Sequence, residues 1–320
     1  MRKMLAVLVP LVVLLIAAGC GDDDGGVEES EGGRSKVVLG VIPIADVAPA
    51  YLGIDKGFFR EEGLDVELQP IEGGAAVIPA VTKGDVQFAF GNAVSLAFAQ
   101  QRGIDFQYVT EGVQGGSSEK DSTNGLIVAK NSDIKTPQDL AGKTFAVNTL
   151  NSLGEVTIKT ALDKEGVETS GLKFVEVPFP DMIPALEEGQ IDVAWATEPF
   201  ISGALAAGHR KILDPMVATH PRLTLAAYFG STEFIEENPE LVEKFKRAMN
   251  RSLDYAAQNE QEAREAIKSN TEIPPEVVDK MPLPYWTSDL NEESIRFLLA
   301  QCEKYGYFDE EIDVDAILGK

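Results

Sequence analysis

Glu198 is the residue of this sequence whose type and position point most directly to binding chemistry. It follows a short apolar segment, Ile191–Ala196, and directly precedes Pro199. An acid at the end of a buried strand can bind an amine, an amidine-like ring nitrogen or a hydroxyl of a ligand. An acid in the first turn of a helix can instead stabilise the helix dipole. Both interpretations of Glu198 are open from the sequence.

A cluster of four polar residues follows another predicted strand: Asn148, Thr149, Asn151 and Ser152. Capping the next helix uses one side chain. The cluster therefore has donors to spare, and we expect at least one of them to face a ligand. Simple capping is the alternative.

Gly73 and Gly74 also stand at a predicted junction between a strand and a helix. Glycine lets a backbone approach a ligand closely, although a plain turn is the alternative. Ligands of open parallel sheets lie beyond the carboxyl ends of the strands, where helix N-termini attract anions. Collecting those strand ends gives the candidate ligand-binding residues: Asp46, Tyr51, Gly73, Gly74, Asn92, Ala93, Gly115, Gly116, Asn148, Thr149, Ser152, Phe179 and Glu198.

The candidate loops also contain aromatic and acidic side chains that could contact a ligand. Tyr51 and Phe179 are expected in loops, where they can pack against a ligand, whereas Trp195 and Phe90 are expected in the core. Asp46 is expected to be a solvated loop acid, with contact to a cation as the alternative. The candidate loops contain no Lys or Arg. This weakens the case for a strongly anionic ligand without excluding it, because helix N-termini supply donors.

Composition excludes several other functions. The 320 residues carry 28 basic and 52 acidic side chains, a net charge of −24, which argues against nucleic-acid binding. The sequence has only two cysteines and two histidines, too few to favour a Cys/His metal site, a disulfide framework or a catalytic thiol paired with a histidine. We expect His209 and His220 to be structural or superficial, and Cys302 to be a buried apolar residue on a helix. No metal or cofactor is expected.

The elements that position the candidate residues occur twice. Ile78–Gly103 aligns without a gap on Ile183–Gly208. Strands alternate with helices in both copies, which predicts an α/β fold of two lobes with mainly parallel sheets. The predicted strands are 37–43, 66–70, 86–90, 144–148, 173–177 and 191–196, and the helices upstream in each copy are 51–61 and 156–164.

Two apolar segments, Gly125–Lys130 and Leu223–Gly230, are expected to run as strands from one lobe into the other. The chain after them is mostly helical, and we place it back on the first lobe. One of its helices starts at Asn238-Pro239. The predicted first lobe is 36–125 with 231–320, and the predicted second lobe is 126–230.

The N-terminus has the pattern of an export signal. Arg2 and Lys3 precede the apolar run Met4–Ala18, which is too short for a bilayer core of ~30 Å. The small residues before Cys20 resemble a bacterial lipobox, in which the signal is removed and the cysteine carries lipid. A secretory signal with an unremarkable cysteine is the alternative. We predict a signal peptide over 1–19 and a flexible, acidic and glycine-rich tether over 20–35.

Four segments together resemble the extracytoplasmic solute-binding proteins of ABC importers for nitrate, sulfonates, taurine and thiamine-pyrimidine precursors. The segments are Lys56–Leu68 (KGFFREEGLDVEL), Asp139–Lys143 (DLAGK), Gly189–Asp192 (GQID) and Trp195–Phe200. The first segment is the most specific. The order and spacing of the four segments match the family over nearly all of 36–320. Gly84–Gln87 departs from the family pattern, which usually has an acid at its last position.

This resemblance implies a type II periplasmic-binding-protein fold, with two lobes joined by a two-strand hinge around one small solute. It also implies a lipid-anchored, non-enzymatic monomer on the outer face of the cytoplasmic membrane, with an ABC permease and its ATPase as partners. An enzyme similar to thiamine-pyrimidine synthases is one alternative, but the cysteine-rich motif and histidine of those relatives do not occur in the candidate loops. An anchored ligand-sensing domain is the other alternative.

Overall fold

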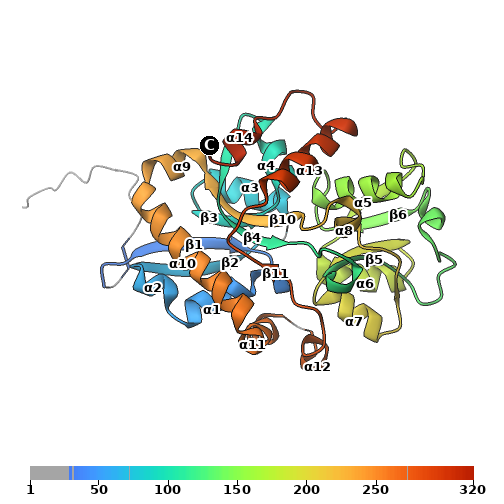
Figure 1. Cartoon of the computed structure of the whole chain (residues 1–320), viewed down its shortest axis with the longest axis horizontal. Helices are drawn as coiled ribbons and strands as arrows, with labels where there is room; N and C mark the ends of the chain where they lie inside the picture. The colour runs from blue at the N-terminus through green and yellow to red at the C-terminus, as the bar shows by residue number, and fades with distance from the viewer. Residues whose placement is uncertain (1–28, 31, 72, 272) are drawn as a thin grey trace, which may run out of the picture.

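The computed structural model describes residues 29–30, 32–71, 73–271 and 273–320. The predicted signal peptide, Cys20 and most of the predicted tether lie outside these residues. The described chain forms two α/β lobes, each built on its own sheet (Figure 1). We call the part built on the six-stranded sheet the first lobe and the part built on the five-stranded sheet the second lobe.

The two sheets share one arrangement of strands. In the first lobe, β1 pairs in parallel with β2 and β3, and β10 adds antiparallel to β3. In the second lobe, β6 pairs in parallel with β7 and β8, and β5 adds antiparallel to β8. The sequence repeat is therefore a structural repeat.

The bounds of the strands are as follows. The order in the first sheet is β11 (Tyr285–Trp286), β4 (Phe106–Gln114), β10 (Thr224–Ser231), β3 (Phe88–Gly91), β1 (Ser35–Val41) and β2 (Leu64–Pro70). The order in the second sheet is β7 (Lys173–Glu176), β6 (Thr144–Val147), β8 (Val193–Thr197), β5 (Asn124–Val128) and β9 (Arg210–Lys211).

Helices cover both faces of the first sheet (Figure 1). The predicted helix over 51–61 is two helices, because Gly57 adopts a left-handed conformation with φ 79° between them. The first lobe contains η1 (Ala45–Val47), α1 (Ala48–Asp55), α2 (Phe58–Glu61), α3 (Gly74–Thr82) and α4 (Ala93–Gln100). The second lobe contains η3 (Pro137–Leu140), α5 (Leu153–Lys164), α6 (Phe179–Glu187), α7 (Phe200–Ala206) and α8 (Pro215–Thr219).

The expected crossing strands do not cross. β5 lies within the second sheet and β10 within the first, although the predicted second-lobe range 126–230 includes most of β10. The chain changes lobe after β4, through a segment that contains η2 (Glu119–Asp121), and again between β9 and β10. The amide of Gly115 donates to the carbonyl of Leu223 at 2.8 Å, which holds the two crossings side by side. The apolar segments were misassigned because a buried strand and a crossing strand have the same pattern.

The helical tail packs mainly on the first lobe. α10 packs against α1, α2 and β4, whereas α13 contacts both α4 and α5 and so touches the second lobe as well. Cys302 on α13 is fully buried, and Trp195 and Phe90 are core residues, which confirms those three predictions. The tail consists of α9 (Thr232–Glu237), α10 (Pro239–Gln258), α11 (Glu260–Asn270), α12 (Pro275–Val278), α13 (Glu292–Lys304) and α14 (Val314–Ile317).

Candidate functional site

Two buried carboxylates, one from each lobe, lie where the lobes touch, and the charge of Glu198 acts on Asp46. Asp46 lies on η1 of the first lobe and is 5% exposed, and Glu198 follows β8 of the second lobe and is 1% exposed. The segments touch, because the amide of Ala45 donates to the carbonyl of Glu198 at 3.2 Å. The groove therefore brings two acids together with little water to separate their charges.

Glu198 is held by the helix that follows it. Its carboxylate accepts hydrogen bonds from the backbone amide of Ser202 at 3.1 Å and from the Ser202 hydroxyl at 2.8 Å, in the first turn of α7. Burial nevertheless raises the pKa of Glu198 to about 7, although the Ser202 bonds and the charge of Lys211 act in the opposite direction. Glu198 is thus a helix-terminal acid that is also buried at the groove, so the two sequence interpretations are compatible.

Asp46 is not the solvated loop acid that the sequence predicted. Burial raises its pKa to about 7, and the charge of Glu198 adds to the effect. Its Oδ1 atom has no hydrogen-bond partner in the described chain, and the same holds for the buried hydroxyl of Tyr228 on β10. Buried polar atoms are normally paired, so these two atoms mark a place where a ligand or water would complete the bonding.

Tyr51 and Tyr228 share the environment of Asp46. The pKa of Tyr228 is raised by burial and by the charges of Asp46 and Tyr51. Tyr51 lies on α1 rather than in the expected loop, because that helix begins at Ala48. Tyr228 was missed by the sequence analysis, since nothing in an apolar strand distinguishes a tyrosine whose hydroxyl lacks a partner.

Two helix N-termini, one from each lobe, are joined by side-chain hydrogen bonds. Asn92 is the N-cap of α4 and accepts from the amide of Ser95, while its Nδ2 donates to the hydroxyl of Ser152, the N-cap of α5, at 3.0 Å. The hydroxyls of Ser95 and Ser152 are 3.1 Å apart. The polar residues at these two strand ends therefore connect the lobes directly.

Replacing Ser152 with alanine is expected to weaken closure of the lobes. The change removes the bonds to Asn92 and Ser95, and each such bond contributes about 1 kcal/mol. The affinity for a solute that requires closure should fall about fivefold or more in isothermal titration. Ser269→Ala, at an exposed serine of α11, is the matched control and should leave the affinity unchanged. Equal affinities of the two variants would show that this contact does not contribute.

Gly73 of the first lobe packs tightly against the second lobe near this point. Its φ is +86°, and a Cβ atom there would lie 2.4 Å from Oγ1 of Thr149 and 3.2 Å from the carbonyl oxygen of Asn148. The glycine is therefore needed for close packing against the other lobe. α3 begins at the next residue, Gly74.

The inner groove is nearly filled by these contacts. A cavity of about 10 Å³ is lined by Gly73, Asn148 and Phe179, and another of about 20 Å³ is lined by Gly73, Asn92 and Asn148. Such volumes correspond to roughly one water molecule. Phe179, expected in a loop, is the first residue of α6 and packs on Trp195 with ring centroids 5.5 Å apart.

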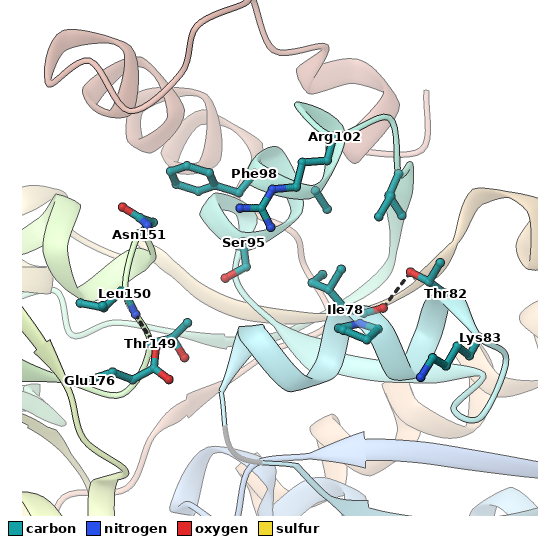
Figure 2. Close-up of a pocket in the computed structure, with 13 residues that line it drawn as sticks. Ile78, Thr82, Lys83, Ser95, Phe98, Arg102, Thr149, Leu150, Asn151 and Glu176 are labelled. Carbon is teal, nitrogen blue, oxygen red and sulfur yellow. Dashed lines mark hydrogen bonds between the residues drawn. The ribbon is translucent and has the colours of Figure 1, made fainter.

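A larger cavity opens at the outer end of the groove (Figure 2). Its volume is about 530 Å³, and both lobes contribute to its walls. Lys83 and Arg102 line it, although the sequence analysis found no basic residue in the candidate loops. They were missed because they follow the C-terminal ends of α3 and α4 rather than strand ends.

The other candidate residues are placed as follows. Thr149 lines the outer cavity, and Ala93 is the buried first residue of α4. Gly115 and Gly116 belong to the first crossing, where a Cβ atom added to each would meet Leu225 and the carbonyl of Asp121 respectively. Five of the candidates, Gly73, Asn92, Asn148, Thr149 and Phe179, line the cavities between the lobes, and Gly115 and Gly116 lie in the first crossing.

The described residues contain neither a metal-binding cluster nor a membrane-spanning helix, and both histidines contact other protein groups. Within them, no group of three or more His, Cys, Asp or Glu side chains could hold a metal ion. His209 contacts Glu187 at 3.1 Å, and His220 contacts the carbonyl of Pro221 at 2.7 Å. None of the helices described is both long enough and apolar enough to cross a membrane.

Three relatives of known name are similar to the chain. The taurine-binding periplasmic protein of Escherichia coli K12 is 27% identical over 63% of this chain and 61% of its own length, so the chain spans less than two thirds of that protein. The formylaminopyrimidine-binding protein of Halalkalibacterium halodurans is 23% identical over 94% of this chain and 87% of its own. The 4-amino-5-hydroxymethyl-2-methylpyrimidine phosphate synthase of Aspergillus parasiticus is 25% identical over 65% and 62%, respectively.

The fold is also found among solved structures. The alkanesulfonate-binding protein SsuA from Xanthomonas axonopodis pv. citri, bound to MOPS, superposes with a TM-score of 0.75, covering 88% of this chain and 97% of that chain at 17% identity. This likeness establishes the type II periplasmic-binding-protein fold. The model of the family described as NMT1/THI5 like matches residues 44–263, which is most of the chain. The protein therefore belongs to the NMT1/THI5 like family.

Proposed function

We propose that the protein captures a small solute between its lobes and delivers it to an ABC permease, with no chemistry performed. The observation that carries this proposal is the contact between the lobes, to which both contribute buried polar groups. Beside it, in the described chain, Asp46 Oδ1 and the Tyr228 hydroxyl have no hydrogen-bond partner. Hydrogen bonds such as Asn92–Ser152 would form when the lobes close, which is the hinge motion of binding proteins.

The acid pair favours a solute that carries an amine or a protonated ring nitrogen at its inner end. A cation between Asp46 and Glu198 would relieve their repulsion and satisfy Oδ1 of Asp46. Aminopyrimidine-like solutes fit this requirement, and taurine fits it through its amine. Nitrate does not fit, since it would place a third negative charge beside the pair.

Location and partners complete the proposal. The chain would be held at the extracytoplasmic face of the membrane by lipid on Cys20, with the part of the predicted tether 20–35 that precedes β1 as the connection and the permease and ATPase as partners. An enzyme is disfavoured because neither histidine lines the groove cavities described above, and the buried Cys302 thiol has its pKa raised to about 12 by burial. A thiol of that kind is not a nucleophile at neutral pH.

Thermal unfolding in the presence of candidate solutes tests this proposal. Taurine, aliphatic sulfonates, nitrate, aminopyrimidines and flavins should be compared. A solute at 100 times its dissociation constant adds about 2.7 kcal/mol to the free energy of unfolding. We expect one chemical class to raise the Tm clearly and to lose that effect with Glu198→Gln. If no class shifts the Tm at millimolar concentration, capture of these solutes is wrong.

A further inference from the structure

Ser152 does not cap the helix that it begins. It is the N-cap residue of α5, yet in the described chain its side chain makes no capping hydrogen bond. Its hydroxyl instead contacts Asn92 and Ser95 of the first lobe, at 3.0 and 3.1 Å. An N-cap side chain normally accepts a hydrogen bond from the first turn of its own helix. The start of α5 must therefore be held by a different side chain.

Glu155 holds the start of α5. It lies in the first turn of the helix and is 6% exposed, and its Oε1 atom accepts a hydrogen bond from the amide of Asn151 at 2.8 Å. Asn151 has φ 51°, a left-handed conformation that asparagine tolerates better than most residues. The bond fixes this turn, which directly precedes Ser152. The position of the Glu155 side chain thus determines where the Ser152 hydroxyl lies.

The second oxygen of Glu155 is bound by a residue of the C-terminal tail. Its Oε2 atom accepts a hydrogen bond from the hydroxyl of Tyr307 at 2.8 Å. The Tyr307 ring packs edge-on against Phe98 of α4, with ring centroids 6.1 Å apart, and Nζ of Lys159 lies 4.4 Å from the Tyr307 centroid. Both carboxylate oxygens of this buried acid are therefore engaged, one at the start of α5 and one by the tail.

The tail around Tyr307 is fastened to the first lobe. Phe308 packs on α4 through Phe98, with ring centroids 5.1 Å apart. The amides of the two residues after Phe308 donate to Oε1 of Gln101, the C-cap of α4, at 3.2 and 3.1 Å. The hydrogen bond from Tyr307 to Glu155 accordingly joins the first lobe to the second.

We propose that Tyr307 is a positioning residue for closure of the lobes. Its hydroxyl orients Glu155, and Glu155 in turn fixes the turn at Asn151. That turn presents the Ser152 hydroxyl to the first lobe. Tyr307 lines none of the three cavities described above, so it acts through Glu155 and not by contact with a solute. This inference rests on the proposed function, because closure of the lobes is what captures the solute.

Hydrogen–deuterium exchange of the ligand-free full chain, followed by mass spectrometry, tests this role without a solute. Tyr307→Phe keeps the ring and removes the hydroxyl, so Glu155 loses one of its two partners. We expect the amides of segment 150–156 to exchange about fivefold faster, the size expected for one lost hydrogen bond. Segment 92–96, across the boundary between the lobes, should also exchange faster, because it loses its fixed partner at Ser152.

Tyr305→Phe is the matched control. Tyr305 belongs to the same turn of the tail, but its hydroxyl lies 3.4 Å from Asp163, near the other end of α5. This variant should change exchange less than twofold in both segments. A Glu155→Ala background checks the route of the effect. Tyr307→Phe should cause no further change there, because the hydroxyl has no acid left to orient.

Four results would overturn the assignment. They are unchanged exchange of segment 150–156 in Tyr307→Phe, a change there that does not reach segment 92–96, equal changes in Tyr307→Phe and Tyr305→Phe, and a full effect of Tyr307→Phe in the Glu155→Ala background.

The solute-capture proposal is judged separately by the thermal panel. If taurine or an aminopyrimidine stabilises the chain while Tyr307→Phe exchanges like the parent, capture stands and Tyr307 has no positioning role. If Tyr307→Phe loosens both segments but no solute of the panel shifts the Tm, the role of Tyr307 in the contact between the lobes stands and capture falls.

Discussion

Gly73→Ala is expected to abolish tight solute binding while leaving the fold intact. The new Cβ atom would overlap Oγ1 of Thr149 and lie 3.2 Å from the carbonyl oxygen of Asn148, both in the other lobe, so the Thr149 side chain must rotate and the two backbones must separate slightly. Because capture depends on closure, the dissociation constant should rise at least tenfold, and ligand-induced stabilisation should largely disappear. Isothermal titration and thermal unfolding measure both effects.

Gly63→Ala provides a matched control for this variant. Gly63 also has a positive φ, +77°, but a Cβ atom there would meet nothing within 4 Å. Both substitutions place alanine in a backbone conformation that favours glycine, with a strain of about 1–2 kcal/mol at Gly63 and about 1–3 kcal/mol at Gly73, whose φ is 86° and ψ is 160°. Only Gly73→Ala adds the contact with the second lobe. If both variants bind the solute equally well, closure at Gly73 is not part of binding.

The acid pair should make the ligand-free protein less stable as the pH rises. Unfolded Asp and Glu release their protons near pH 4, whereas Asp46 and Glu198 hold theirs to a pKa of about 7 because they are buried. Between these values the folded state binds more protons at these two groups, so their contribution to stability is fully present below about pH 4 and is lost as the pH rises through 7. At ~1.4 kcal/mol per pKa unit, we expect a loss of at least about 2 kcal/mol.

Asp46→Asn should reduce this dependence. The asparagine keeps the shape of the side chain and removes the repulsion, so the Tm should fall less between pH 5 and pH 8 than in the parent chain. Glu111, another buried acid with a pKa of about 7, contributes a similar slope to both proteins. Asp85→Asn, at an exposed acid, is the control and should leave the slope unchanged. Identical slopes for Asp46→Asn and the parent would mean that Asp46 is ionised at neutral pH in the folded protein.

The repeated arrangement of strands and helices was predictable from the sequence, because buried parallel strands and glycine turns recur in both halves. The strand positions agree within about two residues, as in 144–148 against β6 at Thr144–Val147. The apolar segment at 223–230 was misassigned, because its partners β3 and β4 are distant in the sequence. Strand pairing depends on residues that are far apart in the sequence, so the local hydrophobic pattern cannot predict it.

The candidate site was predictable in outline for a similar reason. Strand ends gather at one edge of a sheet, so the positions of Asn92, Ser152 and Glu198 alone suggested residues that the structure places in contacts between the lobes. The burial of Asp46 was not found, because it depends on Glu198 and on Trp286, whose Nε1 donates to the Asp46 carbonyl at 2.9 Å. Arg102 was missed because it reaches the groove from the far end of a helix.

A crystal structure of the chain with its best stabilising solute tests the central claim most directly. The account predicts the solute between the two lobes, with a polar atom within hydrogen-bond distance of Asp46, Glu198 or the Tyr228 hydroxyl. A solute bound on the outside of a single lobe, with the groove still filled by protein side chains, would contradict it.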